Sequence, residues 1–449
     1  MKVKIILLAC VFIWGCIGKN NPPKNEKHEE ATETIEPMET IGLYCFFSDP
    51  KMLNFWKSCG VNTLQFLDNA CHESEVARAA SNANMAMMIK TAQEKGFKVY
   101  ILTLSNFKNE NFASQSSLFH PRDEAEMKKR LTKLKEMAEI CSLADGFTIF
   151  AADPGGVTNS MEKGSVDDYA YLTRRFIETI RDAAPNAKIN VNPWAVSAFG
   201  TPEISPFDVE FWLRESDMTK SLLAMPNIIN EKVNVELACH DYYRALALRL
   251  YDDSLHEYPF FPLKTDIDAL RARGVKNIWG WPYFLLDECD DGDGAGKGLQ
   301  ITTRYIYEIV KIYRNFGFNG VMGNYSSDGA YTCSQNTYAL CRFAQDTSAT
   351  PEKVLDEYAS FAATEETCKV LGNILRYIEN YSLWHQKIPE NRRQSNFVTP
   401  FESPAAARAA FNNVIPKKQG DAKLLGMPTQ YLKLVEEKLD ELVRNMNSK

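Results

Sequence analysis

Residues 146–156 read GFTIFAADPGG, an apolar, β-branched and aromatic run that ends in an Asp-Pro-Gly-Gly turn. Such a run predicts a buried strand, and the amphipathic stretch 166–183 that follows it predicts a helix. The same order, a short apolar run and then a helical stretch, repeats along the chain. The predicted strands are residues 41–47, 61–67, 98–104, 146–152, 188–194, 233–239, 275–281 and 320–325.

This alternation predicts the fold class. The intervening helices are expected at residues 83–95, 122–141, 166–183, 207–223, 265–273, 302–316 and 336–345. Eight strand–helix units over roughly 300 residues are what a (β/α)8 barrel requires. A doubly wound sheet is the competing architecture, but no G-x-G-x-x-G turn follows a predicted strand and no phosphate-binding P-loop motif occurs. The sequence therefore predicts an α/β fold, a TIM barrel over residues 41–346.

The first residues predict export. Basic Lys2 and Lys4 precede a short apolar run, and Gly15 stands directly before Cys16. This order is typical of a bacterial lipoprotein signal peptide over residues 1–16, in which Cys16 carries the lipid. An ordinary signal peptide or an uncleaved anchor is the alternative. Residues 17–40 are polar and lack periodicity, so they predict a flexible tether. We expect an exported protein, lipid-anchored to a bacterial membrane on its periplasmic or cell-surface side.

The composition limits the possible partners. The 449 residues carry 51 Lys and Arg against 58 Asp and Glu, a net charge of −7, which argues against nucleic-acid binding. No C-x-x-C pair or zinc-like Cys/His spacing occurs. Of the nine cysteines other than Cys10 and Cys16, most are expected to be small core residues, and one or two disulfides are the alternative. Residues 347–449 are predicted to form an all-helical region, with helices at 351–362, 365–381 and 430–445. The sequence does not indicate an oligomeric state.

Acidic residues follow the predicted strands at the end where barrel enzymes build their active sites. Asp153 follows the fourth strand and precedes a Pro-Gly-Gly turn, Glu236 and Asp241 belong to the sixth, and Glu288 follows the seventh. The structural alternatives are an Asp153 that only caps a turn and a Glu236 that faces solvent. If Glu236 points into the barrel lumen, an unpaired charge there is costly and a partner or a function is expected.

Aromatic and amide side chains accompany these carboxylates. The candidate substrate-binding residues are Asp68, Asn192, Trp194, Tyr242, Trp281, Tyr283, Asn324 and Tyr325. An acidic, glycine-rich segment begins near Asp291, but an EF-hand loop starting there would place Ala295 and Thr302 where calcium ligands are needed. We therefore predict no metal site and no cofactor.

Carboxylates interleaved with aromatic rings suit glycoside hydrolysis. One carboxyl group protonates the leaving oxygen, while the second activates water or attacks the anomeric carbon. We hypothesise Asp153 as the acid and Glu288 or Glu236 as the second carboxylate, with Asp241 in reserve and a glycan as substrate. The alternatives are a catalytically inactive glycan-binding lipoprotein and a polysaccharide lyase.

The stretch 41–358 resembles the barrel of exported bacterial glycoside hydrolases related to the alpha-glucuronidase and beta-hexosaminidase groups. The motifs that carry the resemblance are His120-Pro121-Arg122, Ala151–Gly156, Asn192-Pro193-Trp194 and Leu270–Gly274, with Ala349–Glu352 and Leu355–Tyr358 after the barrel. The resemblance implies a barrel glycosidase. Hexosaminidases place an Asp-Glu pair after strand four, whereas Pro154 follows Asp153 here, which argues against participation of an acetamido group. Alpha-glucuronidases generally carry Glu at the position of Asp153.

Overall fold

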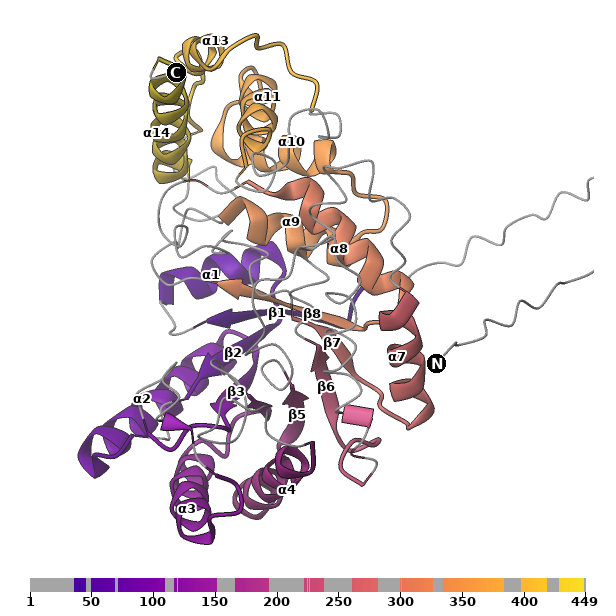
Figure 1. Cartoon of the computed structure of the whole chain (residues 1–449). Helices are drawn as coiled ribbons and strands as arrows, with labels where there is room; N and C mark the ends of the chain where they lie inside the picture. Colours follow the sequence, from indigo (N-terminus) through magenta and orange to yellow (C-terminus); the bar gives the residue numbers. More distant parts are fainter. Residues whose placement is uncertain are drawn as a thin grey trace, which may run out of the picture. The chain divides into compact units, whose positions relative to one another are not determined.

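A computed structural model of the chain (Figure 1) describes the segments that form the barrel and the helices that follow it. Every structural statement below refers to these residues. They are 36–45, 50–68, 72–109, 117–118, 120–151, 166–193, 222–223, 225, 227–237, 261–281, 299, 301–325, 334–382, 397–417 and 428–447.

Eight parallel strands form a closed barrel in sequence order, and β1 pairs with β8 to close it. The strands are β1 (Thr40–Cys45), β2 (Thr63–Leu67), β3 (Lys98–Leu104), β4 (Gly146–Phe150), β5 (Lys188–Asn192), β6 (Asn234–Leu237), β7 (Ile278–Gly280) and β8 (Gly320–Tyr325). All eight fall at the predicted runs, and the predicted TIM barrel is confirmed.

Alternation along each strand divides the side chains between the lumen and the surrounding helices. On β7, a Cβ atom added to Gly280 would lie 2.2 Å from the ring of Tyr313 on α8 (Thr303–Asn315), so this position faces the helical layer. Its neighbours Trp279 and Trp281 therefore face the lumen. On β6 the same alternation sends Glu236 into the lumen, where it reaches side chains of other strands.

Helices surround the barrel, as Figure 1 shows. They are α1 (Pro50–Cys59), α2 (Glu75–Glu94), α3 (Glu124–Ile140), α4 (Val166–Ala183), α7 (Phe261–Ala272), α8 (Thr303–Asn315) and α9 (Ser334–Gln345). Helix α1 was not predicted from the sequence. Helix α2 begins earlier than predicted, because the Ser74 hydroxyl accepts the Ala77 N–H and caps it there. Similarly, the Asp123 carboxylate accepts the Ala125 N–H and caps the start of α3.

The segment after residue 350 is helical where the structure describes it. It contains α10 (Pro351–Ala362), α11 (Cys368–Glu379), α13 (Pro404–Phe411) and α14 (Pro428–Asn447). Residues Pro37–Lys449 form one compact unit, in which α10 packs against α8 and α9. The short α13 was not predicted; a Ser403 cap and Pro404 in its first turn start it.

The cysteines and the apolar character of the helices complete the description of the fold. Cys45, Cys59, Cys141 and Cys341 are buried free thiols in the core, and Cys368 is a partly exposed free thiol. This agrees with the expectation that cysteines act as small core residues. A search of the described helices finds none with the length and apolar character needed to cross a membrane.

Candidate active site

A polar cluster lies inside the barrel and is centred on Glu236 of β6. The carboxylate accepts hydrogen bonds from Gln65 of β2 at 2.8 and 3.0 Å, from Thr148 of β4 at 2.9 Å and from Asn190 of β5 at 2.6 Å. The Gln65 amide also donates to the Thr148 hydroxyl at 2.7 Å. Three strands thus bring neutral donors to one carboxylate. We call these four residues, Glu236, Gln65, Thr148 and Asn190, the lumen cluster.

Burial dominates the electrostatics of this cluster. Glu236 is fully buried, and loss of hydration raises the pKa of its carboxyl group above the ordinary value. The hydrogen bonds from Gln65, Asn190 and Thr148 and the nearby Asn192 amide oppose this rise without cancelling it. Glu236 in turn contributes, after burial and Asp145, to raising the pKa of Tyr100 on β3. The lumen therefore holds a carboxylate that neutral amides and a hydroxyl solvate in place of water.

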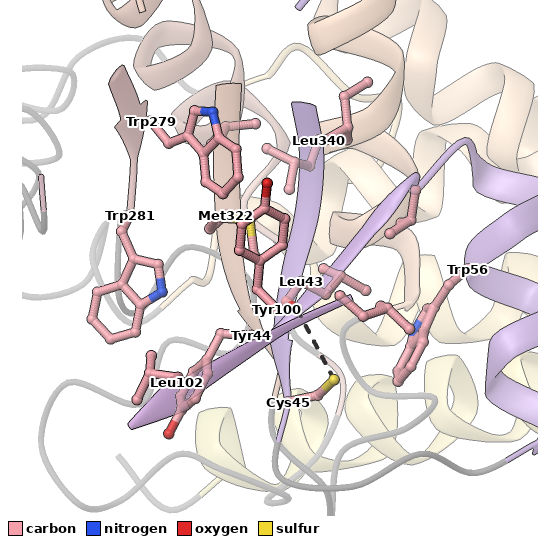
Figure 2. Packing of buried hydrophobic residues seen from close by; sticks show 14 of the residues in the cluster. Leu43, Tyr44, Cys45, Trp56, Tyr100, Leu102, Trp279, Trp281, Met322 and Leu340 are labelled. Atoms are coloured by element: carbon pink, nitrogen blue, oxygen red, sulfur yellow. Dashed lines mark hydrogen bonds between the residues drawn. The ribbon is translucent and has the colours of Figure 1, made fainter. Parts of the chain in front are cut away.

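Aromatic rings also pack inside the barrel, and Figure 2 shows Tyr44, Tyr100, Trp279 and Trp281 among the buried residues. The Trp281 ring lies 5.4 Å from Tyr44 and 5.3 Å from Phe150, measured between ring centroids. Trp279 meets Tyr100 edge to face at 5.1 Å. Tyr44, Phe150 and Trp281 stand at the carboxyl ends of β1, β4 and β7, so they form the aromatic layer nearest the end where barrel active sites lie.

The structure brings some of the predicted site residues together. Glu236 and Asn192 interact in the lumen, and Trp281 lies in the aromatic layer, fully buried. Asp68 directly follows β2 and is buried, and its charge adds to burial in raising the pKa of the Cys141 thiol.

The remaining candidates are placed only in part or lie outside the described residues. The backbones of Asn324 and Tyr325 pair with Tyr44 and Cys45 of β1. The candidates outside the described residues are Cys16, Asp153, Trp194, Asp241, Tyr242, Tyr283 and Glu288.

Each candidate acid follows the last residue of an observed strand by a few positions in the sequence. Asp153 follows the last residue of β4, Phe150, by three positions, and Asp241 follows the last residue of β6, Leu237, by four. Glu288 follows the last residue of β7, Gly280, by eight. Each candidate therefore belongs to a connection that leaves the carboxyl end of a strand.

Sequence reasoning missed Gln65, Thr148 and Asn190, which complete the lumen cluster. Gln65 and Thr148 share a strand face with an apolar residue two positions on, Leu67 and Phe150, whereas Asn190 shares its face with Asn192. A polar residue at an inward position of a barrel strand was the available signal. This signal can be used only after the strand register is known, because a shift of one residue moves every side chain of the strand to the opposite face.

The lumen cluster contains a single carboxylate, and its other members are amide and hydroxyl groups. A search of the described residues for three or more His, Cys, Asp or Glu side chains able to hold one metal ion finds none. The chemistry available in this part of the site is hydrogen bonding to a buried negative charge.

No protein-family model and no curated protein matches the chain. Among solved structures, a GH138 enzyme targeting pectin rhamnogalacturonan II is similar, with a TM-score of 0.50 and 10% identity over 90% of this chain. The chain covers 56% of that enzyme. An O-GlcNAc hydrolase mutant from Thermobaculum terrenum has a TM-score of 0.47 and 11% identity, covering 79% of this chain and 68% of that one. At 10% identity, the likeness to the GH138 enzyme shows the barrel fold alone.

Proposed function

We propose that the chain is a glycoside hydrolase that acts on a glycan or oligosaccharide. The observation that carries the proposal is the position of Asp153, Asp241 and Glu288, each shortly after the carboxyl end of an observed barrel strand. In barrels of this class, catalytic residues come from the ends of several different strands. The shared fold of the similar glycoside hydrolases supports the same assignment as an analogy.

In this proposal Asp153 is the general acid. Its carboxyl group protonates the glycosidic oxygen as the bond to the anomeric carbon breaks. Glu288 is the second carboxylate, which either attacks the anomeric carbon or deprotonates a water molecule. The separation of the two carboxyl groups decides between these roles, about 5 Å for retention and about 6.5–9.5 Å for inversion.

Glu236 is the alternative second carboxylate, and its surroundings support a different role. Both carboxylate oxygens already accept hydrogen bonds, and the group is fully buried. A nucleophile must reach the anomeric carbon, whereas a buried charge acts by orienting its neighbours. Asp241 remains the reserve candidate, since it follows the same strand as Glu236.

The sugar rings would bind over aromatic and amide side chains. Trp and Tyr rings offer apolar faces to pyranose rings, while amide and carboxylate groups bind the hydroxyls. Trp281 packs against Tyr44 and Phe150, which hold its ring in place at the carboxyl end of β7. The residues proposed to contact substrate are Asp68, Asn192, Trp194, Tyr242, Trp281, Tyr283, Asn324 and Tyr325.

Product analysis with purified protein tests the reaction class. We expect a panel of aryl glycosides and polysaccharides to contain a substrate from which the protein releases new reducing ends. A product with ultraviolet absorbance from a new double bond would instead identify a lyase. Binding to a glycan with no product from any member of the panel would identify a glycan-binding protein and contradict the proposal.

The second carboxylate can be identified by chemical rescue. Glu288→Ala is expected to lose turnover by about 100-fold or more, and azide, a small nucleophile, should restore it if Glu288 attacks the sugar. The control is Glu366→Ala, which removes an exposed Glu between α10 and α11 and should leave turnover unchanged. Wild-type turnover in Glu288→Ala would exclude Glu288 and return Glu236 and Asp241 as candidates.

We also propose that the chain is exported and lipidated at Cys16. The support is the order of the basic residues, the apolar run and Gly15-Cys16 in the sequence. Cys16→Ser should remove a lipid-sized mass from the amino-terminal peptide and release the protein from the membrane fraction. An unchanged mass and unchanged membrane association would exclude lipidation at this residue.

A further inference from the structure

Four asparagines link the amino-terminal parts of four neighbouring strands. Asn190 lies in β5, Asn234 begins β6, and Asn277 and Asn319 directly precede β7 and β8. The side-chain amide of Asn319 donates to Asn277 at 2.6 Å, Asn277 to Asn234 at 2.8 Å, and Asn234 to Asn190 at 2.8 Å. Asn190 then donates to the Glu236 carboxylate at 2.6 Å. We call these four asparagine side chains the asparagine relay.

The direction of the relay is fixed at both ends. The backbone N–H of Ile278 donates to the side-chain oxygen of Asn319 at 2.8 Å, and a backbone N–H cannot accept. The oxygen of Asn319 must therefore face Ile278, and its NH₂ group must face Asn277. Each further amide has one oxygen and one NH₂ group, so every orientation follows from the one before. At the other end Glu236, when ionised, only accepts.

Such a chain strengthens the charge on which it ends. Hydrogen-bonded amides aligned in one direction polarise one another, and the effect is larger in a buried site than in water. Asn190, which contacts Glu236, is buried, and Asn234, Asn277 and Asn319 are partly buried. The hydrogen bonds that Glu236 accepts within the described part of the chain come from amide and hydroxyl groups, none of which carries a positive charge. The relay ends on one of these neutral donors, Asn190.

We propose that the asparagine relay holds Glu236 in one orientation and favours its ionised form, which makes Glu236 a positioning residue for the Asn192 amide at the end of β5. Asn192 is the member of the predicted substrate-binding set that interacts with Glu236. The role of Asn192 towards a sugar hydroxyl rests on the proposed function. The relay itself does not, because it is defined by hydrogen bonds within the barrel.

The groups that face Glu236 limit what else could set its charge. Gln65, Thr148, Asn190 and Asn192 do not titrate, and burial opposes ionisation. Tyr100 on β3 is the titratable neighbour on which the charge of Glu236 acts, and burial raises its pKa further from neutrality. A change in the titration of Glu236 that follows a change at Asn319 must therefore pass through the intervening amides or through the charge introduced there.

Asn319→Asp breaks the relay with little change of shape. The carboxylate that this substitution introduces keeps an acceptor for the Ile278 N–H but has no NH₂ group to donate to Asn277. The matched control is Asn62→Asp, just before β2. The Asn62 oxygen accepts the Ile41 N–H at 3.0 Å, and its NH₂ group donates to the Glu39 carbonyl at 2.9 Å, outside the relay. Both variants add a carboxylate at the amino-terminal end of the barrel and lose one donor.

The measurement is the ¹³C NMR titration of the Glu236 side-chain carboxyl group in protein labelled at glutamate, with the resonance identified by its absence from Glu236→Gln. We expect Asn319→Asp to move the midpoint to higher pH by about half a unit or more, a threefold change in the ionisation constant. Asn62→Asp should titrate as the wild type does. An unchanged midpoint in Asn319→Asp, or an equal shift in Asn62→Asp, would overturn the relay.

A second variant and a second readout complete the test. If Asn319→Asp does not fold, Asn319→Ser is used in its place, because the serine hydroxyl keeps an oxygen for the Ile278 N–H. Once a substrate is known, Asn319→Asp should shift the pH profile of kcat in the direction of the NMR midpoint, which a purely structural role would not do. Failure of the proposed function appears as the absence of product and leaves the NMR result intact, so the two failures are distinguishable.

Discussion

Glu379 of α11 accepts the backbone N–H of Arg304 at 2.8 Å, in the first turn of the barrel helix α8. Thr302, which precedes α8, makes no side-chain cap. A helix that follows the barrel in sequence therefore supplies the cap that α8 lacks. The Arg304 guanidinium also reaches Asn380 at 3.2 Å and lies over the Phe397 ring. Glu288 lies in the sequence between β7 and α8, so the contact between Glu379 and Arg304 is at the start of the helix that follows Glu288.

Removal of this cap should destabilise the protein strongly. Glu379 is fully buried, and Glu379→Ala removes the carboxylate that caps the first turn of α8 and pairs with the Arg304 guanidinium. We expect a loss of about 3 kcal/mol in the free energy of unfolding, measured by urea denaturation. Glu366→Ala, at an exposed position shortly before the same helix, should change it by less than about 0.5 kcal/mol. Equal effects of the two substitutions would show that the cap does not stabilise α8.

Glu236 should make stability depend on pH in a defined direction. Burial raises its pKa in the folded protein, so ionisation is harder there than in the unfolded chain. Its contribution to stability is therefore full below the unfolded pKa, about 4.3, and is lost as the pH rises through the folded value. The measurement is the difference in unfolding free energy between wild type and Glu236→Gln across this range. A difference that falls with rising pH is expected, and one that grows would contradict it.

The packing of β7 against α8 gives a test of the strand register. Gly280→Ala places a methyl group 2.2 Å from the Tyr313 ring, and we expect a loss of about 1–3 kcal/mol on denaturation. In the double variant with Tyr313→Ala the ring is gone, so the combined loss should be smaller than the sum of the two single losses. Strict additivity would mean that Gly280 does not face Tyr313.

The sequence predicts the barrel well for a physical reason. Strands such as 98–104 and 320–325 are mostly apolar runs between helical stretches, and this local pattern is typical of buried parallel strands. Helix boundaries are less predictable, because they depend on single caps such as Ser74 and Asp123.

The site is predictable only in part. Glu236 could be recognised because a charge alternates with apolar neighbours on β6. Its partners come from β2, β4 and β5, so they are visible only when the register brings Gln65, Thr148 and Asn190 around it. The asparagine relay is hidden in the same way, since no two of its members are close in sequence.

The claim that Asp153 is the general acid is tested most directly by Asp153→Asn, assayed by release of reducing ends from a substrate of the wild-type protein. The matched control is Asp182→Asn, the same substitution at an exposed position in the last turn of α4, the helix that follows the Asp153 connection. We expect turnover to fall by about 100-fold or more in Asp153→Asn, with an unchanged unfolding transition, and to be unchanged in Asp182→Asn. Wild-type turnover in Asp153→Asn would contradict the account.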